Sequence, residues 1–396
     1  MPVRTPVYLD HNATTPLDPR VLARLAETLR EQFGNPASAS HAFGWAAAAL
    51  VEEAREQVAA LLGAAPAEIV FTSGATESNN LALKGFAARR PEGGHVVTTN
   101  VEHEAVVEPL AELRASGWEV TEVPVGPGGI IDPDAVAAAL TPRTALVSVM
   151  AAQNEVGTLQ PLRAIGALCK ARGVVFHTDA AQAAGKVPLD VAADGIDLLS
   201  LSAHKLYGPK GVGALYVRRR EPRVSLAPQA TGGGQERGLR AGTLNVPGIV
   251  ALGEACRLAR LEMAEEAARL RALRERLLGR LREALPDLRL NGDPERRLPG
   301  NLNLSFPGVP ARRLLPAVTT LAVSAGAACA SAEARPSRIL TALGVPADLA
   351  LASVRIGLGR STTAEEVDYA AGTLAAAVRA LRTENAGTGP AGPGVA

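Results

Sequence analysis

Short apolar runs alternate with helical patterns from about residue 50 to residue 217. A short apolar run bounded by turn residues is typical of a strand buried in a sheet, and a helix between two such strands is typical of a βαβ unit. The alternation therefore predicts the α/β class with a mainly parallel sheet. The expected strands are 68–72, 95–99, 145–150, 174–178, 198–201 and 212–217, and the expected helices are 77–89, 106–116, 133–140 and 162–172.

The remainder of the chain predicts a second, smaller domain. A Gly-rich polar stretch at 231–242 precedes a long helical pattern at 247–285, and a strand-like run at 302–306 and a helical pattern at 364–382 follow. We expect a large domain at residues 15–260 and a small α+β domain made of residues 1–14 and 261–384. Residues 385–396 are expected to form a flexible tail, because small residues and prolines bury little apolar surface.

The composition excludes several classes of protein. With 41 Lys and Arg against 40 Asp and Glu, no overall basic field would draw nucleic acid or an anionic membrane surface. The sequence contains no run of about 18 or more apolar residues, the length that could span a bilayer, so we expect a cytoplasmic protein. The 3 cysteines are too few for a disulfide framework, and the 6 histidines stand singly along the chain, so we expect no metal site.

The segment 69–80, IVFTSGATESNN, reads as a buried strand, a turn of small residues and the start of a helix. Free backbone N–H groups at a helix start can bind a phosphate, assisted by the positive end of the helix dipole. Here these would be the N–H groups of Ala75 and Thr76, with the Thr76 hydroxyl. Ordinary helix capping explains the same pattern equally well.

Two further expected strands end in ionisable side chains. Asp179 closes the apolar run 174–178, and Lys205 follows the run 198–201 directly. Open α/β sheets bind their ligands at the carboxyl ends of the strands. A lysine that can form a Schiff base, an acid for the pyridine nitrogen and a phosphate site are together what pyridoxal phosphate requires. The alternative interpretation is a structural ion pair between Asp179 and Lys205.

These motifs, in their order along the chain, resemble those of a known family. The sequence resembles the class V aminotransferase superfamily of pyridoxal-phosphate enzymes of fold type I, and within it the bacterial cysteine desulfurases. That resemblance covers nearly the whole chain and implies a sheet of the seven-stranded type. The matching stretches are YLDHNATTP (8–16), FGNPAS (33–38), TSGATESNN (72–80), 102–103, 154–155, 174–182, 198–211, 232–245 and 355–360.

The resemblance also implies roles for individual residues. Lys205 would bind the cofactor covalently, Asp179 would pair with the pyridine nitrogen, and His103 would stack on the ring. Arg355, together with Asn35, would bind the substrate carboxylate, because a guanidinium meets a carboxylate with two parallel donors. Thr243 would reach the cofactor of the other subunit, which implies a homodimer. The remaining cofactor contacts would come from Asn154, Gln182, Ser202, His204 and Thr76.

The segment 324–333, SAGAACASAE, resembles the cysteine loop of the NifS/IscS-like group rather than the shorter loop of the SufS-like group. This makes Cys329 the expected sulfur acceptor, whereas without the family context it would be read as a packed thiol. Cys169 and Cys256, on helical patterns, keep that reading. Ala325 and Ala327 replace customary serines of the loop, and Gln153 replaces a customary asparagine.

The resemblance thus predicts a cysteine desulfurase with Cys329, Lys205 and His103 as catalytic residues. It would convert L-cysteine to L-alanine and pass a persulfide from Cys329 to an acceptor protein, either an iron–sulfur scaffold or a tRNA-thiolation protein. Three alternatives stay open from the sequence: a selenocysteine lyase, an aminotransferase on the same fold, and a non-catalytic scaffold that binds pyridoxal phosphate.

Overall fold

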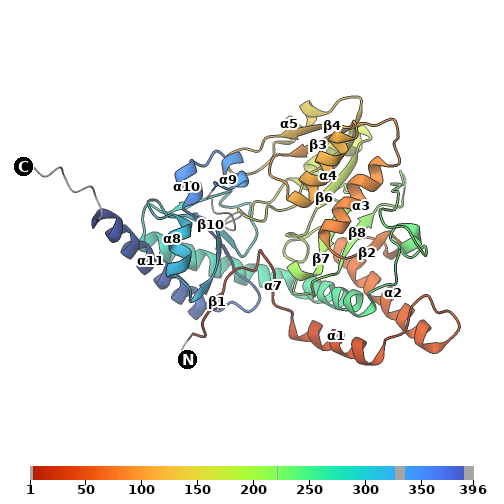
Figure 1. The fold of residues 1–396 in the computed structure, drawn as a ribbon, viewed down its shortest axis with the longest axis horizontal. Helices are drawn as coiled ribbons and strands as arrows, with labels where there is room; N and C mark the ends of the chain where they lie inside the picture. The colour runs from red at the N-terminus through yellow and green to blue at the C-terminus, as the bar shows by residue number, and fades with distance from the viewer. Residues whose placement is uncertain (1–2, 221, 326–334, 388–396) are drawn as a thin grey trace, which may run out of the picture.

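The computed structural model describes residues 3–220, 222–325 and 335–387, and the remaining residues appear as a thin grey trace in Figure 1. Cys329 and residues 388–396 of the expected tail therefore lie outside the described residues.

A seven-stranded sheet forms the centre of the larger part of the molecule. The strand order is β2-β8-β7-β6-β5-β3-β4; neighbours from β7 to β4 pair in parallel, while β8 runs antiparallel to β7 and β2. The connection from β7 to β8 is too short for a crossover helix, so β8 must reverse direction. The predicted α/β class with a mainly parallel sheet is confirmed. The strands are β2 (Ile69–Thr72), β3 (His95–Thr99), β4 (Glu119–Val123), β5 (Thr144–Ser148), β6 (Val175–Asp179), β7 (Leu198–Ser202) and β8 (Gly213–Val217).

Helices cover this sheet, as Figure 1 shows for α3 and α4. Two helices, α2 and α6, end at a glycine in the left-handed conformation, Gly63 (φ 68°) and Gly173 (φ 65°), which stops the helix without strain. The helices of this part are α1 (Pro19–Glu31), α2 (Ala42–Leu62), α3 (Ala75–Ala87), α4 (Glu104–Ala115), α5 (Pro133–Ala139) and α6 (Leu162–Arg172), with single turns at Pro66–Glu68, Ala203–Lys205 and Glu236–Gly238.

The smaller part contains a four-stranded antiparallel sheet of order β12-β13-β10-β9. A separate parallel pair, β1 with β11, brings the N-terminal segment against this part. Its leucines, valines and Phe306 form a hydrophobic cluster of their own. The elements are β1 (Val7–Tyr8), β9 (Arg289–Leu290), β10 (Asn301–Ser305), α8 (Ala311–Ala317), β11 (Leu321–Ala322), β12 (Ser324–Ala325), α9 (Arg338–Ala342), α10 (Ala347–Leu351), β13 (Ser353–Gly357) and α11 (Ala364–Gly387).

The long helix α7 (Val246–Ala284) runs between the two parts (Figure 1). Its residues up to Ala259 pack into the hydrophobic cluster around the large sheet, and those from Leu270 onward pack into the cluster of the smaller part. The domain division near residue 260 stays a prediction. Within the described ranges, none of the helices is long and apolar enough to cross a membrane.

A buried ion pair attaches the Gly-rich stretch to the sheet. The Arg55 guanidinium on α2 donates to both carboxylate oxygens of Glu236, at 2.9 and 2.8 Å, and the Phe71 backbone N–H of β2 donates to the same carboxylate at 2.8 Å. The side chains of Arg55 and Glu236 are 4% and 1% exposed. Because both charges are removed from water, each depends on the other for compensation.

Replacing Glu236 by glutamine should therefore leave the Arg55 charge without its buried partner. We expect Glu236→Gln to lower the free energy of unfolding by about 3 kcal/mol, measured by denaturant unfolding. Glu52 is the matched control, because it pairs with the same Arg55 but is 61% exposed. Glu52→Gln should cost less than about 1 kcal/mol; equal losses from the two variants would contradict the assignment.

Candidate active site

A cavity of about 550 Å³ lies at the carboxyl ends of the central strands. It receives Asp179 from the end of β6, Ser202 from the end of β7 and Lys205 from the turn that follows β7. Arg355 reaches it from β13 of the smaller part. The structure thus brings residues from both parts of the molecule to one cavity. The other predicted site residues that line it are Ala75, Thr76, His103, Asn154, Gln182 and His204.

The start of α3 forms one wall of this cavity. Its N-cap residue, Gly74, has a φ of 150° and provides no side-chain cap, and Ala75 and Thr76 of its first turn line the cavity. A Cβ atom at Gly74 would lie 3.6 Å from Ser202 Oγ, so glycine keeps the space between the helix start and the Ser202 hydroxyl open. A helix start beside a serine hydroxyl at an open cavity is suited to bind an anion.

The Asp179 carboxylate is buried and fixed at both oxygens. Oδ2 accepts a hydrogen bond from Asn79 Nδ2 at 2.7 Å, and Oδ1 accepts one from the Ala181 backbone N–H at 2.9 Å. Asn79 lies on α3, so the helix that forms the anion site also orients the carboxylate.

Lys205 Nζ donates to two backbone carbonyl oxygens, those of Asn12 and Ala13, each at 2.7 Å. Burial and the nearby Arg355 charge lower the pKa of the Lys205 amine to about 8, against the opposing effect of Asp10 and Asp179. No ion pair joins Lys205 to Asp179, both of which are described residues with other partners. The ion pair with Asp179, which was the alternative interpretation of the sequence, therefore does not hold Lys205 in this cavity.

Arg355 is held between two acceptors. Its Nη2 donates to Asp10 Oδ1 at 2.9 Å, and its Nη1 donates to the Asn154 backbone oxygen at 3.3 Å. The buried Nε has no hydrogen-bond partner among the described residues. A planar donor group with unused N–H bonds at a cavity wall is suited to bind a carboxylate.

The two histidines of the cavity differ in their environment. His103 is the N-cap of α4, and its Nδ1 accepts a hydrogen bond from the Ala105 backbone N–H at 3.0 Å. In the neutral ring the proton therefore sits on Nε2. Burial, with the charges of Lys205, Lys210 and Lys186, lowers the pKa of His204 to about 4, so His204 is neutral at neutral pH.

Two predicted site residues do not line this cavity in the single chain. Asn35 lies in another hollow, together with Glu236 and Leu244, and exposed Thr243 immediately precedes Leu244. Cys329 lies outside the described residues. The described chain on either side of it contacts the cavity region: Ser324 lies opposite Arg355 in the β12 and β13 pair, and Ser337 Oγ donates to Glu155 Oε2 at 2.6 Å.

Cys169 and Cys256 are buried in the cluster around the large sheet. Burial and the nearby Asp197 charge raise the pKa of Cys169 to about 12, and burial alone raises the pKa of Cys256 further. Both are unreactive packed thiols, as predicted. In the part of the chain that the structure describes, no group of three His, Cys, Asp or Glu side chains could hold a metal ion.

Three residues that contact the site had no role predicted from the sequence. They are Asn12, whose backbone oxygen accepts from Lys205; Asn79, which donates to Asp179; and Asp10, which binds Arg355. All three lie inside the matching stretches 8–16 and 72–80. Their place as polar residues inside stretches that resemble the family is the signal that could have found them.

Comparisons with known proteins agree with this arrangement. Residues 7–370 match the family Aminotransferase class-V. The chain belongs to this family. Cysteine desulfurase IscS of Anaeromyxobacter dehalogenans (strain 2CP-C) is 54% identical over 381 residues, which cover 96% of this chain and 94% of the relative.

Solved structures extend the comparison to the fold. A NifS-like protein superposes with a TM-score of 0.87 at 38% identity, covering 95% of this chain and 99% of the other. A structure described as SspA in complex with cysteine has a TM-score of 0.79 at 36% identity, covering 90% of this chain and 100% of the other. Within its family the chain groups with the cysteine desulfurases of the NifS/IscS-like type, as the sequence predicted.

The cavity fits pyridoxal phosphate in its donor set. The cavity of about 550 Å³ contains three such groups: the Lys205 amine with its lowered pKa, the fixed and buried Asp179 carboxylate, and the open space at the start of α3. These are the groups that the cofactor's aldehyde, pyridine nitrogen and phosphate each require.

The lowered pKa of Lys205 predicts how its amine reacts in protein freed of bound ligand. With a pKa of about 8, the amine loses its proton well below the pH at which an exposed lysine does. The acetylation rate of Lys205, followed by peptide mass spectrometry, should rise with pH and level off with a midpoint near 8. A lysine in a short unstructured peptide is the control, and its midpoint should lie about two units higher. Coincident midpoints would contradict the electrostatic account of this site.

Proposed function

We propose that this chain is a pyridoxal-phosphate-dependent cysteine desulfurase that converts L-cysteine to L-alanine and carries the sulfur as a persulfide on Cys329. The proposal rests on the observation that one cavity is lined by Lys205, Asp179, Arg355 and the start of α3. The relatives named cysteine desulfurase, which cover almost the whole chain, support the choice of this reaction over transamination. No observation favours the scaffold or selenocysteine lyase alternatives.

Nine residues would hold the cofactor in this proposal. Lys205 would bind it covalently, Asp179 would keep the pyridine nitrogen protonated, and His103 would contact its ring. The N–H groups of Ala75 and Thr76 would bind its phosphate together with Ser202 and His204, and Asn154 and Gln182 would contact the ring oxygen. When bound, pyridoxal phosphate supplies an electron sink for the bond broken at the substrate Cα.

The chain's own residues then bind the substrate and move its protons. Arg355 binds the substrate carboxylate with the donors that Asp10 and Asn154 leave free. The Lys205 amine removes the Cα proton, a task for which a pKa of about 8 is well suited because much of the amine is unprotonated near neutral pH. His103 Nε2 donates a proton on the path to alanine.

Sulfur transfer is the step that Cys329 performs. Its thiolate attacks the substrate sulfur, so that a sulfur–sulfur bond forms while the bond from Cβ to sulfur breaks and its electron pair stays on the carbon. A proton then replaces the sulfur, and the products are L-alanine and a Cys329 persulfide. Ser324 and Ser337, which lie close to the two ends of the described chain and have partners in or next to residues of the cavity, support this reach.

The proposal includes a homodimer and a cytoplasmic location. Thr243 and Asn35 would act at the cavity of the partner subunit, which agrees with their place outside the cavity of their own chain. The acceptor of the persulfide would be an iron–sulfur scaffold or a tRNA-thiolation protein, for which the name IscS of the relatives is the support.

Cys329→Ala tests the sulfur-transfer step. Because the cofactor groups remain, the variant should still bind pyridoxal phosphate and L-cysteine, seen as a change in the visible spectrum. It should release alanine at least about 100-fold more slowly, since no other described thiol is accessible. Mass spectrometry after cysteine treatment should find the extra sulfur on Cys329 of the parent protein.

Cys169→Ala is the matched control and should retain both alanine release and the persulfide. Alanine and sulfide release by Cys329→Ala at the parent rate would refute the proposed mechanism.

A further inference from the structure

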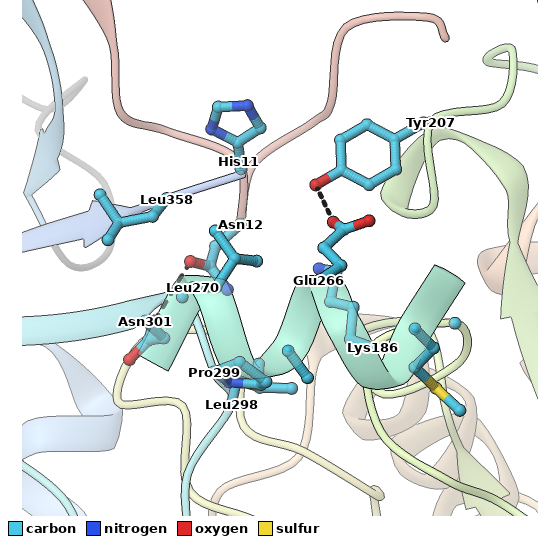
Figure 2. Close-up of a pocket in the computed structure, with 14 residues that line it drawn as sticks. His11, Asn12, Lys186, Tyr207, Glu266, Leu270, Leu298, Pro299, Asn301 and Leu358 are labelled. Atoms are coloured by element: carbon cyan, nitrogen blue, oxygen red, sulfur yellow. Dashed lines mark hydrogen bonds between the residues drawn. The ribbon is translucent and has the colours of Figure 1, made fainter. Parts of the chain in front are cut away.

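A second cavity, of only about 20 Å³, lies behind the wall of the large one, and Asn12 lines both. Figure 2 shows its lining, with the Lys186 side chain close to Glu266 on α7 and with Tyr207 and His11 above. None of the proposed catalytic steps uses Lys186. A lysine placed next to the cofactor cavity without a role in the reaction needs an explanation.

No carboxylate forms an ion pair with Lys186 in the part of the chain that the structure describes. Burial and the charges of Lys205 and Arg355 lower the pKa of Lys186 to about 7, while Glu266 partly opposes this shift. His11 and the Tyr207 hydroxyl are the other titratable groups that line this cavity. Keeping an amine in these surroundings is costly unless the amine makes a specific contact.

That contact is a hydrogen bond to the side chain of Gln182. Lys186 Nζ donates to Gln182 Oε1 at 3.2 Å, and Asn12 Nδ2 donates to the same oxygen at 3.3 Å. On its other side, Gln182 Nε2 donates to the Asn12 backbone oxygen at 2.8 Å. That backbone oxygen also accepts from Lys205 Nζ at 2.7 Å.

These contacts allow only one orientation of the Gln182 amide. The Asn12 backbone oxygen can only accept, so the group of Gln182 that faces it must be the NH₂ group, and the amide oxygen then faces the Lys186 and Asn12 side-chain donors. A flipped amide would turn its NH₂ group toward Lys186 and its oxygen toward the Asn12 carbonyl oxygen, and the three hydrogen bonds of the Gln182 amide in their present form would be lost. The NH₂ group has a second hydrogen, which is left for the large cavity that Gln182 lines.

We propose that Lys186 is a positioning residue of the active site, which fixes the Gln182 amide so that its NH₂ group is presented to the cofactor. This inference rests on the proposed function, because the amide orientation matters only if pyridoxal phosphate occupies the cavity. A donor at the cofactor's ring oxygen stabilises negative charge there, which makes the neighbouring Lys205 nitrogen easier to deprotonate. Lys186 thus tunes the Lys205 nitrogen through Gln182.

The test is a pH titration of the visible spectrum of the cofactor-loaded protein. Lys186→Met keeps the length of the side chain and removes its donors, so the apparent pKa of the Lys205 nitrogen should rise by about one unit. The dissociation constant of pyridoxal phosphate should rise several-fold. Lys186→Arg keeps the donors, so both its apparent pKa of the Lys205 nitrogen and its dissociation constant should stay near those of the parent protein. Lys170→Met, the same change at an exposed lysine outside both cavities, should leave both values unchanged.

A second background separates positioning from simple charge removal. In Gln182→Leu protein, adding Lys186→Met should shift the apparent pKa of the Lys205 nitrogen by less than half as much as it does in the parent protein, because the amide through which Lys186 acts is gone. An equal shift in that background, or a parent-like pKa and dissociation constant in Lys186→Met, would overturn the inference. If the parent protein itself took up no pyridoxal phosphate, the proposed function would fail instead, so the two failures are distinguishable.

Discussion

The Lys205 amine is held by the backbone carbonyl oxygens of Asn12 and Ala13, and this interaction joins the main parts of the structure. Lys205 comes from the end of the central sheet. The N-terminal segment that supplies the oxygens also bridges to β13 at Gly357 and accepts a hydrogen bond from Arg355 at Asp10. The cavity therefore exists only where the sheet, the N-terminal segment and the smaller part meet.

The same meeting point explains the electrostatics of the site. Burial and the neighbouring basic groups lower the pKa of both Lys205 and Lys186, while Asp10 and Asp179 partly oppose the shift at Lys205 and Glu266 partly opposes it at Lys186. Such a site attracts anions, which the proposed binding of a phosphate group and a substrate carboxylate requires. It also keeps amines partly unprotonated near neutral pH, which a proton-abstracting lysine needs.

The sheet was predictable because its strands are buried on both faces and so read as apolar runs. β3 was predicted with the bounds His95–Thr99 that the structure shows, and α6 with Leu162–Arg172. β4 was missed because it lies at the sheet edge, where only Val123 of its residues is buried and no apolar run forms.

The site was predictable only in part, for a related reason. Asp179 and Lys205 stand at the ends of apolar runs, where the sequence itself marks them. Asn79 and Asn12 act through partners that are distant in the sequence, as in the bond from Asn79 to Asp179 100 residues away. Such contacts are set by tertiary packing, so the sequence alone does not show which residues meet. Because Cys329 lies outside the described residues, its role stays a prediction.

The most direct test of this account is to locate the cofactor on the chain. Borohydride reduction of the purified, cofactor-loaded protein, followed by peptide mass spectrometry, should find pyridoxal phosphate attached to Lys205, the amine whose pKa is lowered at the ends of the central strands. Lys210 lines the same cavity and is the built-in comparison. Attachment to Lys205 alone is the predicted result, and attachment to Lys210, or to no lysine, would contradict it.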